Sequence, residues 1–179
     1  MKRTLSLFAV IAIIILSGFT AITWQVFESK EGAYKVLMPG VPEEQEQSVE
    51  SAVGPLTIHM AMLQAPDDIM YLSNYSDYPD SLVNSTMGEA TLKQFFTSAM
   101  DGAAKNVSGT ITKKQVIAYK NYPGRHMVAE IKEKNVVLEM DMYLVNNRTY
   151  FLEAVYLKGT KDITGVKKFF GSFQVTSSK

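Results

Sequence analysis

Few side chains in this sequence are of the types that carry out chemistry. The 179 residues include no cysteine and only two histidines, His59 and His126. The lack of cysteine excludes thiolate nucleophiles, disulfides, and zinc or iron–sulfur sites ligated by cysteine. A serine hydrolase needs a nucleophile, a histidine base and an orienting acid, but no Gly-x-Ser-x-Gly motif is present. We therefore predict a protein that is not an enzyme, with no catalytic residues and no cofactor.

Metal binding and paired-carboxylate catalysis have little support in the sequence. Two isolated histidines do not form a zinc motif, so we predict no metal site. His59 alternates with apolar residues, which predicts an exposed histidine on a strand. Two sets of acidic residues have ordinary structural explanations. We predict solvated loops for Glu43, Glu44, Glu46, Asp67 and Asp68, and cross-strand charge pairs for Glu130, Glu139, Asp141 and Glu153.

The tyrosines leave two alternatives open. Tyr71 and Tyr75 either fill the core with their hydroxyls at its rim, or belong to an exposed contact surface. Tyrosine is common at protein interfaces because it offers rigid, amphipathic contact area. Should such a surface exist, we predict that it binds a protein partner and consists of Tyr75, Asp77, Tyr78, Tyr122, Arg125 and His126. Alternatively, Asp77 and Arg125 simply bond to each other.

The N-terminus has the pattern of an export signal. Lys2 and Arg3 precede an apolar run, and no further charged residue occurs before Glu28. Such a run is typical of a signal peptide or of a signal anchor that spans the membrane. We predict that residues 1–23 are one of these two. Residues 24–179 then lie outside the cytoplasm, in a periplasm, in a thylakoid lumen or secreted, and stay anchored to the inner membrane if the leader is not cleaved.

Composition and periodicity predict one α+β domain over residues 24–179. Lys+Arg and Asp+Glu both number 18, so no excess positive charge attracts nucleic acid. Residues 88–105 have helical periodicity, with Thr86 and Glu89 at capping-box spacing, and residues 162–170 predict a second helix. We predict strands in most of the rest and a polar loop at 42–47. Residues 148–157 have two apolar faces, which predicts a central strand of an antiparallel sheet covered by helices on both sides.

Several motifs together resemble a known family. They combine turns with aromatic anchors: Phe27, Gly32, Tyr34, Val36, Met38, Pro39, Gly40 and Pro42; Tyr71, Tyr75, Asp77, Tyr78 and Pro79; Tyr122, Pro123, Gly124 and Arg125; and Lys168, Phe169, Phe170, Ser172 and Phe173. This pattern resembles extracytoplasmic bacterial domains of the cyanobacterial type with a PsbP-like fold. The resemblance implies an antiparallel sheet between helices, in an α/β/α sandwich, and it assigns no residue a function.

Two functions are consistent with these observations. The first is an exported or membrane-tethered, non-catalytic accessory module that docks on a protein partner in the envelope or lumen. The alternative is an envelope carrier of a small ligand, or an enzyme, that uses a pocket in the domain. An exposed aromatic patch would favour the first, and an enclosed pocket with converging polar groups would favour the second.

Overall fold

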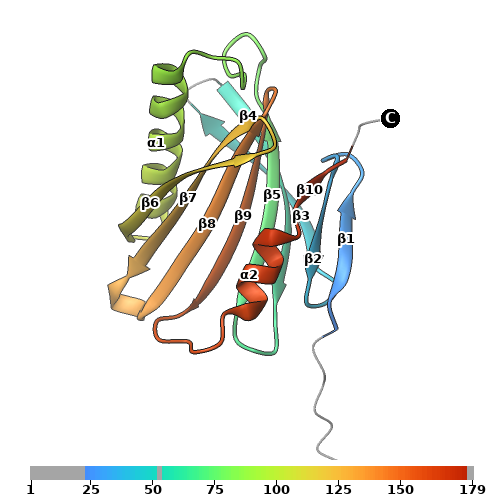
Figure 1. The fold of residues 1–179 in the computed structure, drawn as a ribbon, viewed down its shortest axis with the longest axis vertical. Helices are drawn as coiled ribbons and strands as arrows, with labels where there is room; N and C mark the ends of the chain where they lie inside the picture. Colours follow the sequence, from blue (N-terminus) through green and yellow to red (C-terminus); the bar gives the residue numbers. More distant parts are fainter. Residues whose placement is uncertain (1–22, 52–53, 177–179) are drawn as a thin grey trace, which may run out of the picture.

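The computed structural model describes residues 23–51 and 54–176, which form two antiparallel sheets and two α-helices (Figure 1). The predicted leader, apart from Thr23, lies outside the described residues. Within these two ranges, no helix is both long and apolar enough to cross a membrane.

The larger sheet has seven strands in the order β3-β4-β5-β9-β8-β7-β6. The strands span β3 Glu43–Ser51, β4 Gly54–Gln64, β5 Met70–Asp77, β6 Thr110–Tyr119, β7 Tyr122–Ile131, β8 Val136–Val145 and β9 Arg148–Leu157. The smaller sheet has the order β1-β2-β10, with β1 at Gln25–Ser29, β2 at Tyr34–Met38 and β10 at Gln174–Val175. The helices are α1 at Glu89–Asn106 and α2 at Thr164–Gly171, with a 3-10 turn at Lys132–Lys134.

Each face of the large sheet carries its own core, because successive side chains of a strand point to opposite faces. On β8, Met142 and Leu144 pack in the core beneath α1, whereas Tyr143 and Val145 pack in the other core, on the side of α2 and the small sheet. The two helices therefore lie on opposite faces of the sheet (Figure 1). This arrangement confirms the α/β/α sandwich, with the small sheet as an addition to one layer.

The core beneath α1 is built largely from methionine. Phe96 and Met100 of α1 meet a row of buried apolar side chains on β7 and β8: Met127, Leu138, Met140, Met142 and Leu144. Methionine adapts to irregular gaps, which suits it to fill this core.

Two local predictions were wrong. Residues 42–47 are not a loop, because Glu43 begins the edge strand β3, which has exposed side chains on both faces and hence no apolar alternation. Thr86 does not cap α1. Its backbone N–H and hydroxyl instead donate to Asn84 Oδ1, and α1 begins after Gly88 without a side-chain cap.

Tyr34 and Tyr71 are buried in the core on the side of α2 and the small sheet. Replacing each by phenylalanine should change the free energy of unfolding in opposite directions. The Tyr71 hydroxyl has no hydrogen-bond partner among the described residues, whereas the Tyr34 hydroxyl lies 2.8 Å from the buried Ser73 Oγ. Tyr71→Phe should raise the free energy of unfolding by about 1 kcal/mol, because it removes an unpaired buried polar group. Tyr34→Phe should lower it by about 1 kcal/mol, since it leaves Ser73 unpaired. Urea denaturation of both variants measures the difference, and a loss of stability in Tyr71→Phe would contradict the first expectation.

Candidate functional site

The six residues predicted as a partner-binding surface do not form one patch. Tyr75 and Asp77 lie on β5 and Tyr78 follows them, whereas Tyr122, Arg125 and His126 lie on β7. Strands β9 and β8 lie between β5 and β7, which places the two groups about 14 Å apart across the sheet at ordinary strand spacing. Each group is also divided between the two faces of the sheet: Tyr75 and Tyr122 pack in the core on the α2 side, whereas Tyr78 and Arg125 contact phenylalanines of α1.

On β7, Arg125 and His126 point to opposite faces. The Arg125 guanidinium lies 4.8 Å from the centre of the Phe96 ring, on the α1 side. His126 Nδ1 lies 2.8 Å from Asp141 Oδ1, and its Nε2 lies 3.8 Å from Glu139 Oε1. Both partners are on β8, so His126 belongs to a cross-strand polar cluster and its side chain is mostly covered.

Asp77 bonds to Arg148, and the alternative pairing of Asp77 with Arg125 was wrong. The Arg148 Nε and Nη2 groups each donate to one Asp77 carboxylate oxygen, both at 2.6 Å. This bidentate pair joins β5 to β9 and raises the pKa of Arg148 further above its usual value. Sequence reasoning could not find the pair, because the β5–β9 register brings together residues that are 71 positions apart.

The carboxylates on the central strands bond to neighbouring side chains, but the predicted cross-strand charge pairs are found only in part, and one carboxylate is buried. Glu130 pairs with Lys158, and Glu139 accepts a hydrogen bond from the Tyr156 hydroxyl. Glu153 accepts one from Asn74 Nδ2 at 2.9 Å. Burial raises the pKa of the Glu153 carboxyl, and this hydrogen bond offsets the rise in part.

The raised pKa of Glu153 predicts how stability depends on pH. Because the folded-state pKa lies above the unfolded value, stability is lost as the pH rises through the folded-state pKa. Glu153→Gln cannot ionise and retains an oxygen that accepts from Asn74, so it should melt at a higher temperature than wild type at pH 7. The difference should vanish below about pH 4. Thermal unfolding at both pH values measures this, with Glu130→Gln as the control that should show no gain. An equal gain at both pH values would contradict the titration argument.

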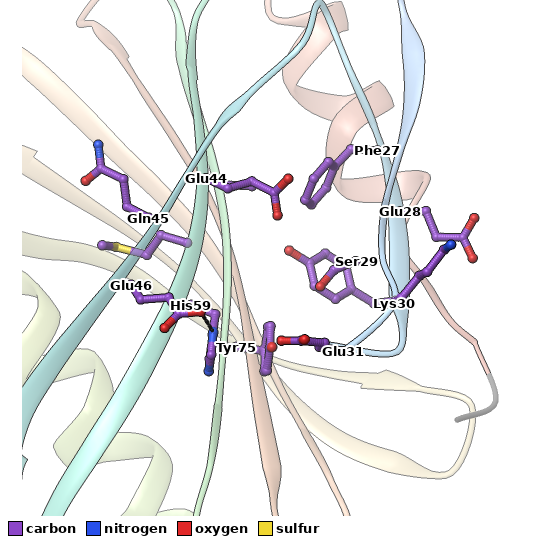
Figure 2. Close-up of a pocket in the computed structure, with 13 residues that line it drawn as sticks. Phe27, Glu28, Ser29, Lys30, Glu31, Glu44, Gln45, Glu46, His59 and Tyr75 are labelled. Carbon is purple, nitrogen blue, oxygen red and sulfur yellow. Dashed lines mark hydrogen bonds and ion pairs between the residues drawn. The ribbon is translucent and has the colours of Figure 1, made fainter. Parts of the chain in front are cut away.

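A first cleft lies where the β1–β2 turn faces the edge of the large sheet. We call it the turn cleft; its volume is about 260 Å³, and its main lining residues are Phe27, Glu31, Glu44, Glu46, His59 and Tyr75. Side chains of the turn and of β3 and β4 face each other across it (Figure 2). The sequence predicted His59 as an exposed strand residue, but its ring lies partly covered in this cleft.

Tyr75 forms the floor of the turn cleft and is almost fully buried, at 5% exposure. The His59 ring stacks on it with ring centres 4.5 Å apart and an angle of 4°. The Arg148 guanidinium also lies over this ring, 4.8 Å from its centre. These contacts confirm the alternative in which Tyr75 fills the core, and they hold His59 in a defined orientation.

A second cleft of about 510 Å³ lies at the end of the large sheet, between the β6–β7 turn, the β8–β9 turn and β10. We call it the strand-end cleft; its main lining residues are Asp77, Tyr119, Lys120, Tyr122, Asn147 and Arg148. Two of the predicted site residues, Asp77 and Tyr122, therefore share one cleft, and Tyr78 is joined to its rim by a hydrogen bond from Asn147 Nδ2.

Lys120 is the charged residue of the strand-end cleft that lacks an acidic partner. It is exposed, and its Nζ lies 5.4 Å from the centre of the Tyr119 ring. It makes no ion pair within residues 23–51 and 54–176, whereas the charge of Arg148 is balanced by Asp77. The cleft thus combines three tyrosines, Tyr119, Tyr122 and Tyr150, with one net positive charge.

Comparison with known proteins identifies the fold. No family model matches the sequence, and no curated protein matches it. The solution structure of the cyanobacterial PsbP (CyanoP) from Synechocystis sp. PCC 6803 matches 88% of this chain and 95% of its own chain, at 12% identity and a TM-score of 0.56. A protein of unknown function from Pseudomonas aeruginosa, described as a putative regulator, matches 80% of this chain and 88% of its own, at 6% identity and a TM-score of 0.38.

The chain therefore has a PsbP-like fold, as the resemblance of its turn and aromatic motifs implied. At this level of identity the similarity concerns the fold alone, and function has to be argued from the clefts and their residues.

Proposed function

We propose that this protein is an exported or membrane-tethered accessory module without catalytic activity, which binds a protein partner outside the cytoplasm through the strand-end cleft. The observation that carries the proposal is the composition of this cleft, in which Tyr119 and Tyr122 flank the unpaired cation Lys120. Tyrosine is enriched at interfaces, and an unpaired cation favours an acidic segment on the partner.

Two further observations support a role in the cell envelope. The leader pattern of Lys2, Arg3 and the apolar run predicts export, and the PsbP-like fold fits the class of extracytoplasmic accessory domains that the sequence resembles. Neither observation depends on the cleft.

Photocrosslinking in the native envelope tests the docking surface. A photoreactive phenylalanine analogue at Tyr122 should crosslink to one defined protein, and the same analogue at Val116 should not. Val116 is the matched control because it is 72% exposed on β6 but does not line the cleft. Lys120→Glu should reduce the crosslink about tenfold if it opposes an acidic partner, whereas Lys167→Glu on α2 should leave it unchanged. The same products from both positions would overturn the proposal.

Export and tethering need a separate measurement. The full-length chain made in a bacterial host should be recovered outside the cytoplasm. An intact mass that lacks about 21–23 residues, in a soluble fraction, would show a cleaved signal peptide. A full-length mass in the membrane fraction would show an anchor, and cytoplasmic recovery would contradict both.

A further inference from the structure

We infer that the turn cleft is a binding site for a divalent transition-metal ion, best matched by zinc, with Glu31, Glu46 and His59 as ligands. This inference goes beyond the proposed docking function and does not rest on it, because it concerns a different cleft. It also departs from the prediction of no metal site that the sequence alone supports.

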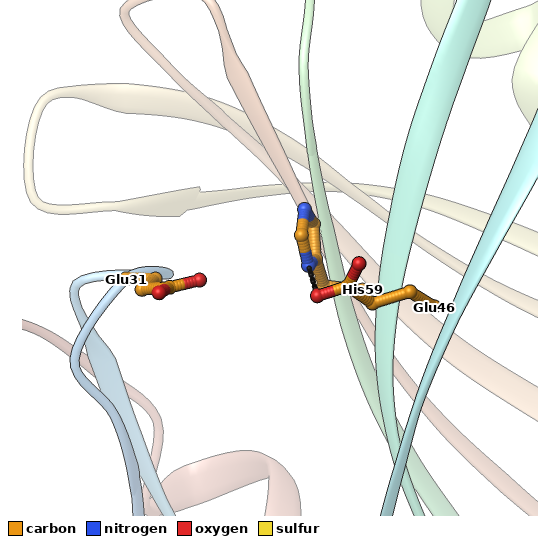
Figure 3. Close-up of side chains that lie close together, drawn as sticks. All are labelled: Glu31, Glu46 and His59. Atoms are coloured by element: carbon orange, nitrogen blue, oxygen red, sulfur yellow. Dashed lines mark hydrogen bonds and ion pairs between the residues drawn. The ribbon is translucent and has the colours of Figure 1, made fainter.

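The three ligands come from three segments of the chain that the fold brings together. Glu46 on β3 and His59 on β4 are directly paired across the strands, and His59 Nδ1 lies 3.1 Å from Glu46 Oε1. Glu31 approaches from the opposite side, from the β1–β2 turn (Figure 3). One ligand atom from each residue lies within 4.8 Å of the other two.

These separations are close to those of a metal site. In a tetrahedral zinc site with bonds of about 2.0 Å, ligand atoms are about 3.3 Å apart. The Glu46–His59 pair already meets this spacing. Glu31 and Glu46 are exposed side chains, so rotation about their side-chain bonds brings the third ligand into range without movement of the backbone.

The charge of the cleft also favours a cation. Four carboxylates line it, those of Glu28, Glu31, Glu44 and Glu46, against one cation, Lys30. Within the described part of the chain, no lysine or arginine forms an ion pair with any of the four. Carboxylates gathered in a concave site without cationic partners concentrate negative potential there, and a bound dication neutralises it.

Neighbouring side chains hold the ligands in place, as the groups hydrogen-bonded to metal ligands do in known sites. The stacked ring of Tyr75 orients His59. The turn that carries Glu31 is fixed by two hydrogen bonds from β9: Arg148 Nη1 donates to Glu31 O at 2.7 Å, and the Tyr150 hydroxyl donates to Gly32 O at 2.8 Å. The third ligand is therefore anchored to the large sheet.

The ligand set indicates the class of metal. An imidazole nitrogen favours zinc and its first-row neighbours over magnesium and calcium, which prefer an all-oxygen shell. One histidine and two carboxylates supply three ligands, and the fourth position of a tetrahedral site stays open to water.

A zinc titration tests this inference, and the second histidine, His126, serves as an internal control because it is not one of the proposed ligands. Zinc chloride is titrated into the full-length protein, purified in mild detergent without an affinity tag, and followed by calorimetry and by the imidazole resonances of ¹⁵N-labelled histidine. We expect one zinc ion per chain and a shift of the His59 resonances, with those of His126 unchanged. Glu31→Gln and His59→Gln should each weaken binding at least about tenfold, and His126→Gln less than about twofold.

Near-UV circular dichroism shows whether each variant is folded, so that lost binding is not confused with lost structure. Unchanged zinc affinity in His59→Gln, a shift of His126 in place of His59, or no binding to the folded wild type would each overturn the inference. Crosslinking from Tyr122 is measured on the same preparations and reports on docking separately.

Discussion

Replacing Phe169 by alanine should lower the free energy of unfolding by about 4 kcal/mol, the usual cost of truncating a fully buried phenylalanine. Phe169 has 0% exposure and packs edge-on against Tyr71 with ring centres 5.3 Å apart. It is also one of two buried residues by which α2 is held to the large sheet. A helix of eight residues is not stable alone in water, so α2 depends on this contact.

The adjacent Phe170 is the matched control. It has the same side chain in the same helix but lies only partly buried at the margin of the core. Phe170→Ala should therefore cost clearly less, about 1–2 kcal/mol. Urea denaturation followed by tyrosine and tryptophan fluorescence measures both variants. A loss in Phe170→Ala that equals or exceeds the loss in Phe169→Ala would show that α2 is held in a different way.

Gly32→Ala should lower the free energy of unfolding by about 2 kcal/mol, because it forces an added methyl group into filled space. A Cβ at this position would lie 2.7 Å from Ser29 Oγ and 2.7 Å from two ring carbons of Tyr75. The Tyr75 ring cannot retreat, since it is nearly fully buried and stacked on His59. The turn must therefore move away from the large sheet, and this movement also displaces Glu31.

The same substitution at Gly102 should have the opposite effect on stability. It lies in the interior of α1, and an added Cβ would meet nothing within 4 Å. Gly102→Ala should raise the free energy of unfolding by about 0.5–1 kcal/mol, because alanine loses less backbone entropy in a helix. Chemical denaturation of both variants is sufficient, and a destabilisation shared by Gly32→Ala and Gly102→Ala would rule out the steric explanation.

The long strands and the long helix could be predicted, because the spacing of apolar residues along the chain follows which side of each element is buried. The two apolar faces of residues 148–157 predicted a central strand, and β9 is the fourth of seven strands in the sheet. Helical spacing placed α1 within one residue of its observed ends. Periodicity failed at β3, because an edge strand with solvent on both faces has no reason to alternate.

The clefts could not be predicted, because they depend on which strands become neighbours. His59 alone has the pattern of an exposed strand residue, and only the approach of the β1–β2 turn brings Glu31 to it. In the same way, Arg148 reaches Asp77 and Tyr75 only through the β5–β9 pairing. The sequence does contain one sign of the turn cleft, the three acidic residues at 43–46 and the single histidine, His59, on the next strand. Such a combination of residues is too common on protein surfaces to identify a binding site.

The small sheet joins the beginning of the described chain to its end. Strand β10 pairs with β2, and just before it the Ser172 hydroxyl accepts a hydrogen bond from the Leu37 amide, 135 residues away in sequence. A nascent chain that has made β2 has therefore no means of completing this layer until β10 has emerged. Closure of such a long loop is slow, so we expect the β2–β10 pair to form after the hairpins of the large sheet, whose strands are close in sequence.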